Sequence, residues 1–340
     1  MTAAAPPAAD QPSGVEIVKR LGVARSRLKQ EIAKVVVGQT AIIDSMLIAL
    51  LCRGHVLLHG VPGLGKTLMA RTLARTLEMT FKRVQFTPDL MPADITGTDV
   101  MEEDQATGQH RVQFIPGPIF TNFLLADEIN RTPPKTQAAL LQAMQEQEVT
   151  VGTQTFQLPP PFFVVATQNP IEMEGTYPLP EAQLDRFMFN LQVQYPTLDE
   201  EVAIIKGTTG QLTTEAAAVL PATDLLALQS LVRGVPVADD VVRFAARLVA
   251  ATRPAAGTDR PGIHKYLAYG ASPRAAQFLV LGGKARALLA GRYHVDFADI
   301  QELARPVLRH RLVLNFHARA DDIDADALIG RLLETIPTEE

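Results

Sequence analysis

Residues 54–67 read Gly-His-Val-Leu-Leu-His-Gly-Val-Pro-Gly-Leu-Gly-Lys-Thr, and this stretch decides the fold. Its first part, residues 54–59, is a short apolar run of the kind that forms a buried strand of a parallel sheet. Its second part, residues 60–67, fits the phosphate-loop pattern G-x-x-x-x-G-K-[ST], and a helical pattern follows through Leu77. Because the pattern stands between an apolar strand and a helix, the sequence predicts an α/β domain that binds a nucleotide.

The glycine-rich loop has the chemistry that a polyphosphate requires. Backbone N–H groups can point inward and the following helix adds the positive end of its dipole, while Gly63 and Gly65 can adopt backbone angles that other residues resist. We expect Lys66 to reach the β- and γ-phosphates and the Thr67 hydroxyl to ligate Mg²⁺. The residues expected to contact the nucleotide here are Gly60, Pro62, Gly63, Leu64, Gly65, Lys66, Thr67 and Leu68.

Two further strand ends supply acidic and amide groups. An apolar run at residues 123–126 precedes Asp127 and Glu128. Asp127 is expected to orient Mg²⁺, and Glu128 to polarise the water that attacks the γ-phosphate. Another apolar run, at residues 162–166, leads to Asn169, whose amide could hydrogen-bond that water or the γ-phosphate. The alternatives are a merely polar strand end for the two acids and an Asx turn before Pro170 for the amide.

Two arginines are candidates for charge stabilisation during phosphoryl transfer. Arg186 lies in a Leu-Asp-Arg-Phe segment, and Arg274 follows Ser272-Pro273, which is a helix-start signature. A guanidinium from the same chain or from a neighbour can stabilise the charge that develops in the reaction. A cation in the first turn of a helix is unfavourable unless an anion compensates it. The alternative for each arginine is an ordinary pairing with a carboxylate.

Strands alternating with helices imply a parallel α/β sheet, and the pattern changes along the chain. From residue 224 onward it is helical, with no convincing buried strand. Two stretches interrupt the α/β part as insertions: 89–118 has a turn at Gly108, and 148–158 reads as a hairpin that turns near Gly152. The expected organisation is a disordered tail over 1–14, a nucleotide-binding domain over 15–197, a connector over 198–222 and a smaller all-α domain over 223–340.

Composition narrows the class of protein. The 340 residues are 47% hydrophobic and 20% charged with a net charge of -5, which fits neither a disordered chain nor a strongly basic nucleic-acid module. A single cysteine, Cys52, excludes a disulfide framework and a cysteine-rich zinc site. Residues 1–14 lack the basic patch and the apolar core of a signal peptide, and no apolar run is long enough to span a membrane. We therefore expect a cytoplasmic protein that neither inserts into membranes nor binds nucleic acid.

The motifs together resemble those of the MoxR-type AAA+ ATPases. The resemblance rests on residues 60–67, 124–137 (LLADEINRTPPKTQ), 166–170 (ATQNP) and 179–187 (LPEAQLDRF), and extends from Val37-Gly38-Gln39 to residues 307–311. It implies a P-loop αβα sandwich followed by an all-α lid domain. It also implies assembly into a homo-oligomeric ring, usually of six, with ATP sites between subunits.

The resemblance also implies roles for individual residues. Lys66 and Thr67 match the Walker A pair, and Asp127 and Glu128 the Walker B pair. Asn169 matches sensor 1, Arg186 the arginine finger that acts on a neighbour's ATP, and Arg274 sensor 2, which reports the nucleotide state to the lid. Val37, Gly38 and Gln39 match the segment near adenine. For Arg131, a second intersubunit role and a local salt bridge both stay open.

The function implied is an Mg²⁺-dependent ATPase whose cycle remodels, matures or inserts metal into client proteins, with a von Willebrand factor A domain protein as partner. The ATPase subunit of a metal chelatase has the same insertion pattern and remains an alternative. A nucleotide-gated binding scaffold with little turnover is a second alternative, against which Glu128 argues. A GTPase is disfavoured because the guanine-reading motif Asn-Lys-x-Asp is absent from the sequence.

Overall fold

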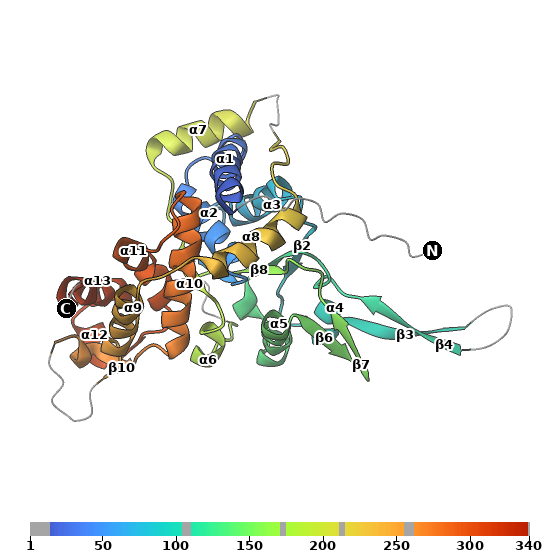
Figure 1. Cartoon of the computed structure of the whole chain (residues 1–340). Coiled ribbons are helices and arrows are strands. Elements are labelled where there is room, and N and C mark those ends of the chain that lie inside the picture. The colour runs from blue at the N-terminus through green and yellow to red at the C-terminus, as the bar shows by residue number, and fades with distance from the viewer. Residues whose placement is uncertain (1–13, 104–109, 171–174, 211–214, 255–261, 339–340) are drawn as a thin grey trace, which may run out of the picture.

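The structure, a computed structural model, describes residues 14–103, 110–170, 175–210, 215–254 and 262–338. An α/β part with two projecting hairpins lies beside a helical part that contains the C-terminus (Figure 1). The expected tail over 1–14 lies outside the described residues except for Gly14, which begins the first helix. None of the helices in the described ranges is long and apolar enough to span a membrane.

A five-stranded parallel sheet forms the centre of the α/β part. Its strand order is β2-β5-β8-β1-β9. The strands are β1 (Val56–His59), β2 (Phe81–Gln85), β5 (Phe123–Asp127), β8 (Phe163–Gln168) and β9 (Phe189–Gln192). The three inner strands, β5, β8 and β1, coincide with the three apolar runs of the sequence, because a strand covered on both faces needs apolar side chains throughout. The predicted parallel α/β sheet is confirmed.

Alternate residues of the inner strands face two different helical layers, as strand geometry requires. Val56, Leu58 and Leu125 pack with helices α1 (Gly14–Ala33), α2 (Thr40–Leu51) and α3 (Lys66–Thr76) in a core that continues into the C-terminal helices. Leu57 and Leu124 face the opposite side and pack with α5 (Pro134–Glu146). The sheet therefore lies between two helical layers, as the predicted αβα sandwich requires.

Both expected insertions contain antiparallel hairpins. After the short helix α4 (Pro92–Thr96), strands β3 (Gly97–Glu103) and β4 (His110–Pro116) pair from Gly97 with Pro116 to Glu103 with His110. The expected turn at Gly108 lies outside the described residues. Strands β6 (Glu148–Val151) and β7 (Gln154–Gln157) form the second hairpin, whose turn contains Gly152 at φ 58°. The rings of Phe114 and Phe156 stack with centroids 4.1 Å apart, so the two hairpins pack against each other.

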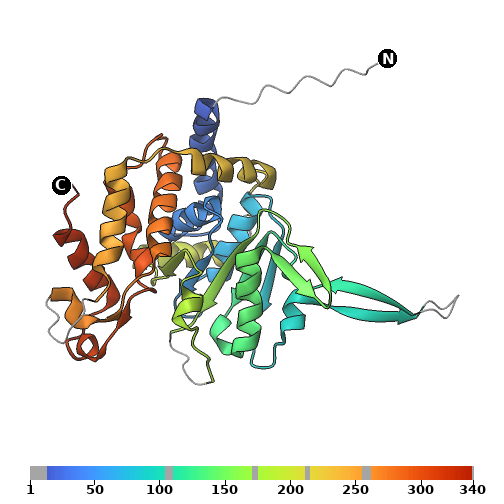
Figure 2. The same cartoon turned by 60° about the horizontal axis from the view of Figure 1, so that its bottom comes forward.

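The C-terminal part is helical, as predicted. It contains α8 (Ala222–Gly234), α9 (Asp239–Ala251), η2 (Gly262–Tyr266), α10 (Pro273–Leu289), α11 (Phe297–Leu308), α12 (Phe316–Ala320) and α13 (Ala325–Thr335). A small antiparallel sheet of β10 (Leu267–Tyr269) and β11 (Val313–Leu314), which the sequence pattern did not indicate, joins two of its loops. Helix α10 packs on α1, α2, α8, α9 and α11, so the helical part rests on the α1–α2 layer (Figure 2).

The expected connector over 198–222 is partly helical. Residues Leu198–Thr208 form α7, capped by reciprocal hydrogen bonds between Thr197 and Glu200. None of its residues is buried, and Leu198, Val202 and Ile205 are exposed along one side of the helix. The connector without regular structure is therefore shorter than expected.

A buried histidine joins the sheet to α5. The Nε2 atom of His55 lies 3.0 Å from the carbonyl oxygen of Met144, and its Nδ1 accepts a hydrogen bond of 3.0 Å from the Val164 N–H. Phe162 and Phe163 pack against the ring, with centroids 5.9 Å and 6.4 Å away. Burial lowers the pKa of His55 to about 4. The imidazole is thus neutral, with its proton on Nε2.

Candidate nucleotide site

The phosphate loop connects the end of β1 to the start of α3. Gly63 and Gly65 have φ values of 85° and 73°, and Gly65 caps the N-terminus of α3. A Cβ atom at either position would meet no other atom within 4 Å, so the backbone angle rather than space requires glycine there. The helix N-terminus that follows this loop is a site for an anion.

Lys66 lies inside the curve of the loop. Its ammonium donates hydrogen bonds to the carbonyl oxygens of Gly60 and Val61. Partial burial lowers the pKa of Lys66, and the nearby carboxylates of Asp127 and Glu128 oppose that shift. The lysine and both acids therefore belong to one electrostatic site.

Asp127 is held at the end of β5 from two directions. Its Oδ2 accepts hydrogen bonds of 3.0 Å and 2.6 Å from the Arg83 guanidinium on β2. Its Oδ1 accepts one of 2.5 Å from the hydroxyl of Thr167 on β8. The carboxylate is buried, so these donors fix its orientation.

Glu128 follows with a strained backbone. Its φ of 57° and ψ of 50° lie in the left-handed region, which a residue with a side chain occupies at a cost. Its N–H donates to the Thr167 hydroxyl at 2.8 Å. Its Oε2 accepts hydrogen bonds from Gln85 Nε2 at 2.8 Å and from Arg131 Nη1 at 3.1 Å. The local salt bridge considered for Arg131 is therefore present.

The strand register brings these groups to one edge of the sheet. His59 of β1 lies beside Gln168 of β8, and the Gly60 N–H donates to the Gln168 carbonyl at 3.3 Å. Asn169 is the next residue and is buried. The phosphate loop, the two acids and Asn169 therefore gather where the carboxyl ends of the parallel strands meet, which is the usual ligand-binding edge of an α/β sheet.

The segment expected near adenine, residues 37–39, immediately precedes α2. Gly38 has a φ of 69°, and Gln39 donates from Nε2 to the Gln194 carbonyl at 2.9 Å beyond β9. Next to it, α2, β9, α11 and α13 enclose a cleft of about 650 Å³.

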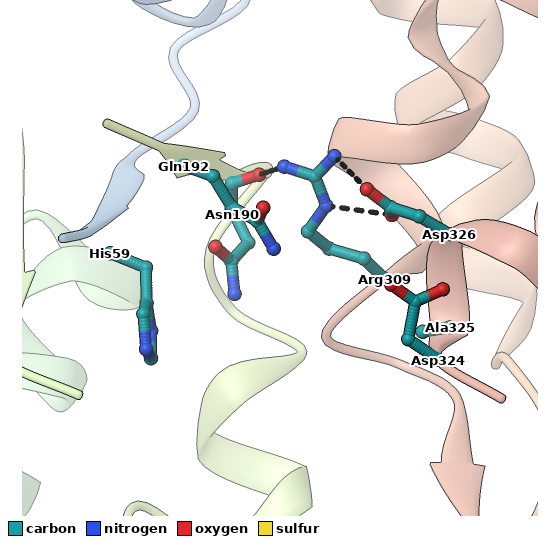
Figure 3. Close-up of a pocket in the computed structure, with 7 residues that line it drawn as sticks. All are labelled: His59, Asn190, Gln192, Arg309, Asp324, Ala325 and Asp326. Atoms are coloured by element: carbon teal, nitrogen blue, oxygen red, sulfur yellow. Dashed lines mark hydrogen bonds and ion pairs between the residues drawn. The ribbon is translucent and has the colours of Figure 1, made fainter. Parts of the chain in front are cut away.

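A smaller cavity of about 160 Å³ adjoins the cleft where the two parts of the molecule meet, and both hollows include Gln192 and Arg309 in their lining. His59, the residue before the phosphate loop, also lines the small cavity (Figure 3). Arg309 pairs there with Asp326 through two hydrogen bonds and donates a third to the Asn190 carbonyl. Burial, with Lys66 and Arg309 nearby, lowers the pKa of His59.

Arg186 lies at the other end of the strands. Val56 pairs with Phe189 and His59 with Gln192, so Arg186, which precedes β9, is near the start of β1, whereas the phosphate loop follows its end. The four strand residues between the start of β1, near Arg186, and its end, before the phosphate loop, correspond to at least about 13 Å. The Arg186 side chain is partly exposed and makes no hydrogen bond or ion pair with any residue that the structure describes.

Arg274 lies near Arg186 and not near the phosphate loop, so these two arginines belong to a second group of residues. It lies in the first turn of α10, and its Nη1 is 3.4 Å from Asp185 Oδ2. Asp185 also accepts hydrogen bonds from the Ser272 hydroxyl, at 3.1 Å and 3.2 Å, and from Arg311 Nε at 2.7 Å. The anion required by a cation at a helix start is therefore Asp185. The carboxylate pairing considered as an alternative is present for Arg274.

Several residues of these two groups were not singled out from the sequence. Arg83 and Gln85 alternate on β2, and Asp185 and Arg311 are far apart in the chain. The signal for the first pair is the period-2 placement of two polar side chains on a strand beside β5.

The residues at the sheet edge fit Mg²⁺ in part. The Asp127 carboxylate and the Thr67 hydroxyl are oxygen donors of the kind that this ion prefers. No group of three or more histidine, cysteine or acidic side chains in the described ranges could hold a metal by itself. Such an ion would therefore take most of its ligands from phosphate and water, as Mg²⁺ commonly does.

Comparisons with known proteins agree with this description. Residues 55–189 match the model of the "ATPase family associated with various cellular activities (AAA)", and residues 260–332 match that of the AAA lid domain. The crystal structure of a candidate ATPase from Cytophaga hutchinsonii superposes with a TM-score of 0.85 and 39% identity, over 96% of this chain and 98% of that one. The fold is thus a AAA nucleotide-binding domain with a AAA lid.

Curated relatives match over most of the chain. The chaperone MoxR1 of Mycobacterium tuberculosis is 45% identical over 306 residues, which cover 90% of this chain and 80% of the relative. The uncharacterized protein YeaC of Bacillus subtilis is 43% identical over 90% of this chain and 92% of its own. The protein MoxR of Methylorubrum extorquens is 34% identical over 92% and 95%, respectively. The chain belongs to the MoxR family of AAA+ ATPases.

Proposed function

We propose that this protein is an Mg²⁺-dependent ATPase whose active sites form between copies of the chain. The observation that carries the proposal is the distance between the phosphate-loop residues and the group that contains Arg186. The phosphate loop and Arg186 occupy opposite ends of the sheet, and Arg186 is partly exposed without a described partner. A guanidinium in that position can reach a phosphate only on another molecule.

Each side chain at the sheet edge has a role in this proposal. The loop N–H groups and Lys66 bind the β- and γ-phosphates, and Glu128 orients and polarises the attacking water once Gln85 and Arg131 release it. Asn169 hydrogen-bonds that water or the γ-phosphate. Mg²⁺, held through Thr67 and Asp127, would neutralise charge on the phosphates.

In this proposal the neighbouring chain completes each nucleotide site with two of its arginines. Arg186 acts as the finger on the neighbour's γ-phosphate, where such a group is worth about 10³–10⁵ in rate. Arg274 is tied to the same end of the molecule through Asp185, so we assign it to the same intersubunit nucleotide. The adenine is assigned to the region of Val37, Gly38 and Gln39 at the start of α2, next to the 650 Å³ cleft.

Membership of the family supports a proposal about the wider function. We propose a homo-oligomeric ring of six subunits that works in the cytoplasm as a chaperone on client proteins. A partner with a von Willebrand factor A domain, whose metal site the ring matures, is part of the same proposal. The exposed hairpin β3–β4, with Met101 and Val112 paired across its strands, supplies a surface for such a protein.

The test measures ATP hydrolysis per subunit at increasing protein concentration. We expect the specific activity to rise as subunits associate, and Arg186→Ala to abolish hydrolysis while binding of a fluorescent ATP analogue persists. Arg319→Ala on α12 serves as the matched control, because Arg319 is exposed and belongs to neither group of residues. An activity that is independent of concentration and unaffected by Arg186→Ala would overturn the shared site.

The client proposal is tested with the Glu128→Gln protein, which should bind ATP without hydrolysing it. A pull-down with ATP should retain a client, which fails to bind when Lys66→Ala is added to remove nucleotide binding. A Glu128→Gln protein that hydrolyses ATP at the original rate would favour the scaffold alternative. Copurification with a large tetrapyrrole-binding subunit would favour the chelatase alternative.

A further inference from the structure

A buried arginine of the lid forms hydrogen bonds with the segment that carries Arg186. Arg311 follows α11, and its side chain is 2% exposed. It donates to Asp185 twice, at 2.7 Å to the carboxylate and at 2.9 Å to the backbone carbonyl. It also donates to the carbonyls of Phe187, at 2.7 Å, and Met188, at 3.3 Å. One guanidinium thus binds the backbone on both sides of Arg186.

Other lid residues contact the same segment. The Nε2 atom of His310 lies 3.1 Å from the Phe187 carbonyl, and Ser272 and Arg274 bind the Asp185 carboxylate. Phe187 and Met188 are fully buried, so the chain after Arg186 is fixed in the core. Arg186 is therefore a partly exposed residue whose chain neighbours are anchored, mainly by the lid.

Burial of Arg311 needs an explanation beyond a surface ion pair. A buried guanidinium is costly unless its donors are satisfied, and an apolar side chain would fill such a site at less cost. Arg311 satisfies its donors on the finger segment and on the carbonyl of Val307 within the lid. The Phe278 ring of α10 packs on its face, at 5.2 Å from the guanidinium carbon. It is thus rigidly connected to both α10 and α11, so a movement of these helices must move residues 185–188.

We propose that Arg311 is a positioning residue which, together with Asp185, sets the direction in which Arg186 leaves the chain. The lid of one subunit thereby controls the catalytic competence of the finger that this subunit offers to its neighbour. The inference rests on the proposed role of Arg186 in a neighbour's site. According to the inference, Arg311 affects ATP hydrolysis at the site of the adjoining subunit and not at the site of its own chain.

The test uses mixtures of two inactive proteins. The acceptor, Arg186→Ala, keeps its own site but offers no finger. The donor, Glu128→Gln, keeps its finger but cannot hydrolyse ATP. Mixed oligomers should hydrolyse ATP where a donor finger meets an acceptor site. If this unmodified mixture is inactive, the proposed shared site is refuted and the present inference with it.

Arg311→Lys is then placed in one component at a time. Lysine keeps the charge but cannot reach four acceptors at once, so the finger should be misplaced. In the donor, it should lower the rate of the mixture by about 10- to 100-fold, the range expected when a catalytic group is displaced by about 1 Å. In the acceptor, which has no finger to position, it should leave the rate and the binding of the ATP analogue unchanged.

Two controls separate positioning from stability. Arg286→Lys makes the same substitution at a lid arginine that pairs with buried Asp299, and it should not reproduce the effect in the donor. Asp185→Asn is nearly isosteric and serves if Arg311→Lys does not fold, as judged by circular dichroism and gel filtration. Equal losses in donor and acceptor would reveal a purely structural role, and no loss in the donor would refute positioning; either result overturns the inference.

Discussion

Acidification is expected to destabilise this protein through His55, which is buried between the sheet and α5. Its pKa is about 4 in the folded chain, against about 6.5 for a histidine in an unfolded chain. The unfolded chain therefore binds more protons between these values. The stability contributed by neutral His55 is fully present above about pH 6.5 and is lost as the pH falls toward about 4.

The magnitude follows from the two pKa values. Between about pH 7.5 and about pH 5, linkage gives a loss of about 2 kcal/mol in the free energy of unfolding from this one group. The protonated ring would also lose the hydrogen bond that its Nδ1 accepts from the Val164 N–H. A loss of this size is a large fraction of the stability of a typical domain.

Urea unfolding followed by circular dichroism at a series of pH values provides the assay. The His55→Gln protein keeps an amide that can donate and accept but does not titrate, so its stability should fall less steeply with acid than that of the original protein. His310, whose pKa burial also lowers, is present in both proteins and cancels in the difference. Parallel stability curves for the two proteins would refute the reasoning.

Three further predictions concern the sheet edge and the first insertion. Gln85→Ala should raise basal ATP hydrolysis about fivefold, because it removes a hydrogen bond of about 1 kcal/mol that holds Glu128 away from water; phosphate release measures this, and an unchanged or slower rate contradicts it. Arg83→Gln should lower the Mg²⁺ concentration for half-maximal hydrolysis by up to about fivefold, since a competing cation leaves Asp127; a higher Mg²⁺ requirement in the titration would count against it. Gly97→Ala should open the first hairpin to protease, because a Cβ would lie 2.3 Å from the Ile115 carbonyl oxygen at a φ of 95°; a digestion pattern like that of the original protein would show that the hairpin accommodates the methyl group.

The inner strands of the sheet could be predicted from the sequence and the edge strands could not. In β5 every residue is buried, and its first four residues, 123–126, form an unbroken apolar run before Asp127. In β2 only Val84 is buried, and the other residues carry polar or partly covered side chains that give no run. Helix α7 did have signals, the Thr197–Glu200 capping box and the helical spacing of Leu198, Val202 and Ile205, although none of its residues is buried.

The same distinction applies to the candidate site. The phosphate loop could be predicted because its chemistry is contained in consecutive residues, whose types and order are set by backbone geometry. The contact of Asp185 with Arg311 joins positions 126 apart in the chain, and no spacing rule connects them. The sequence could place Arg186 in a motif, but only the strand register separates it from its own phosphate loop.

The placement of the glycine loop and Arg186 at opposite ends of one sheet gives polarity to any assembly that joins them. Contacts of this kind are head-to-tail, and they either close into a circle or continue as a filament. In a closed circle the two rims would be chemically different. Every β3–β4 hairpin would emerge with the same orientation, so a molecule approaching from one rim would meet a surface that the other rim does not present.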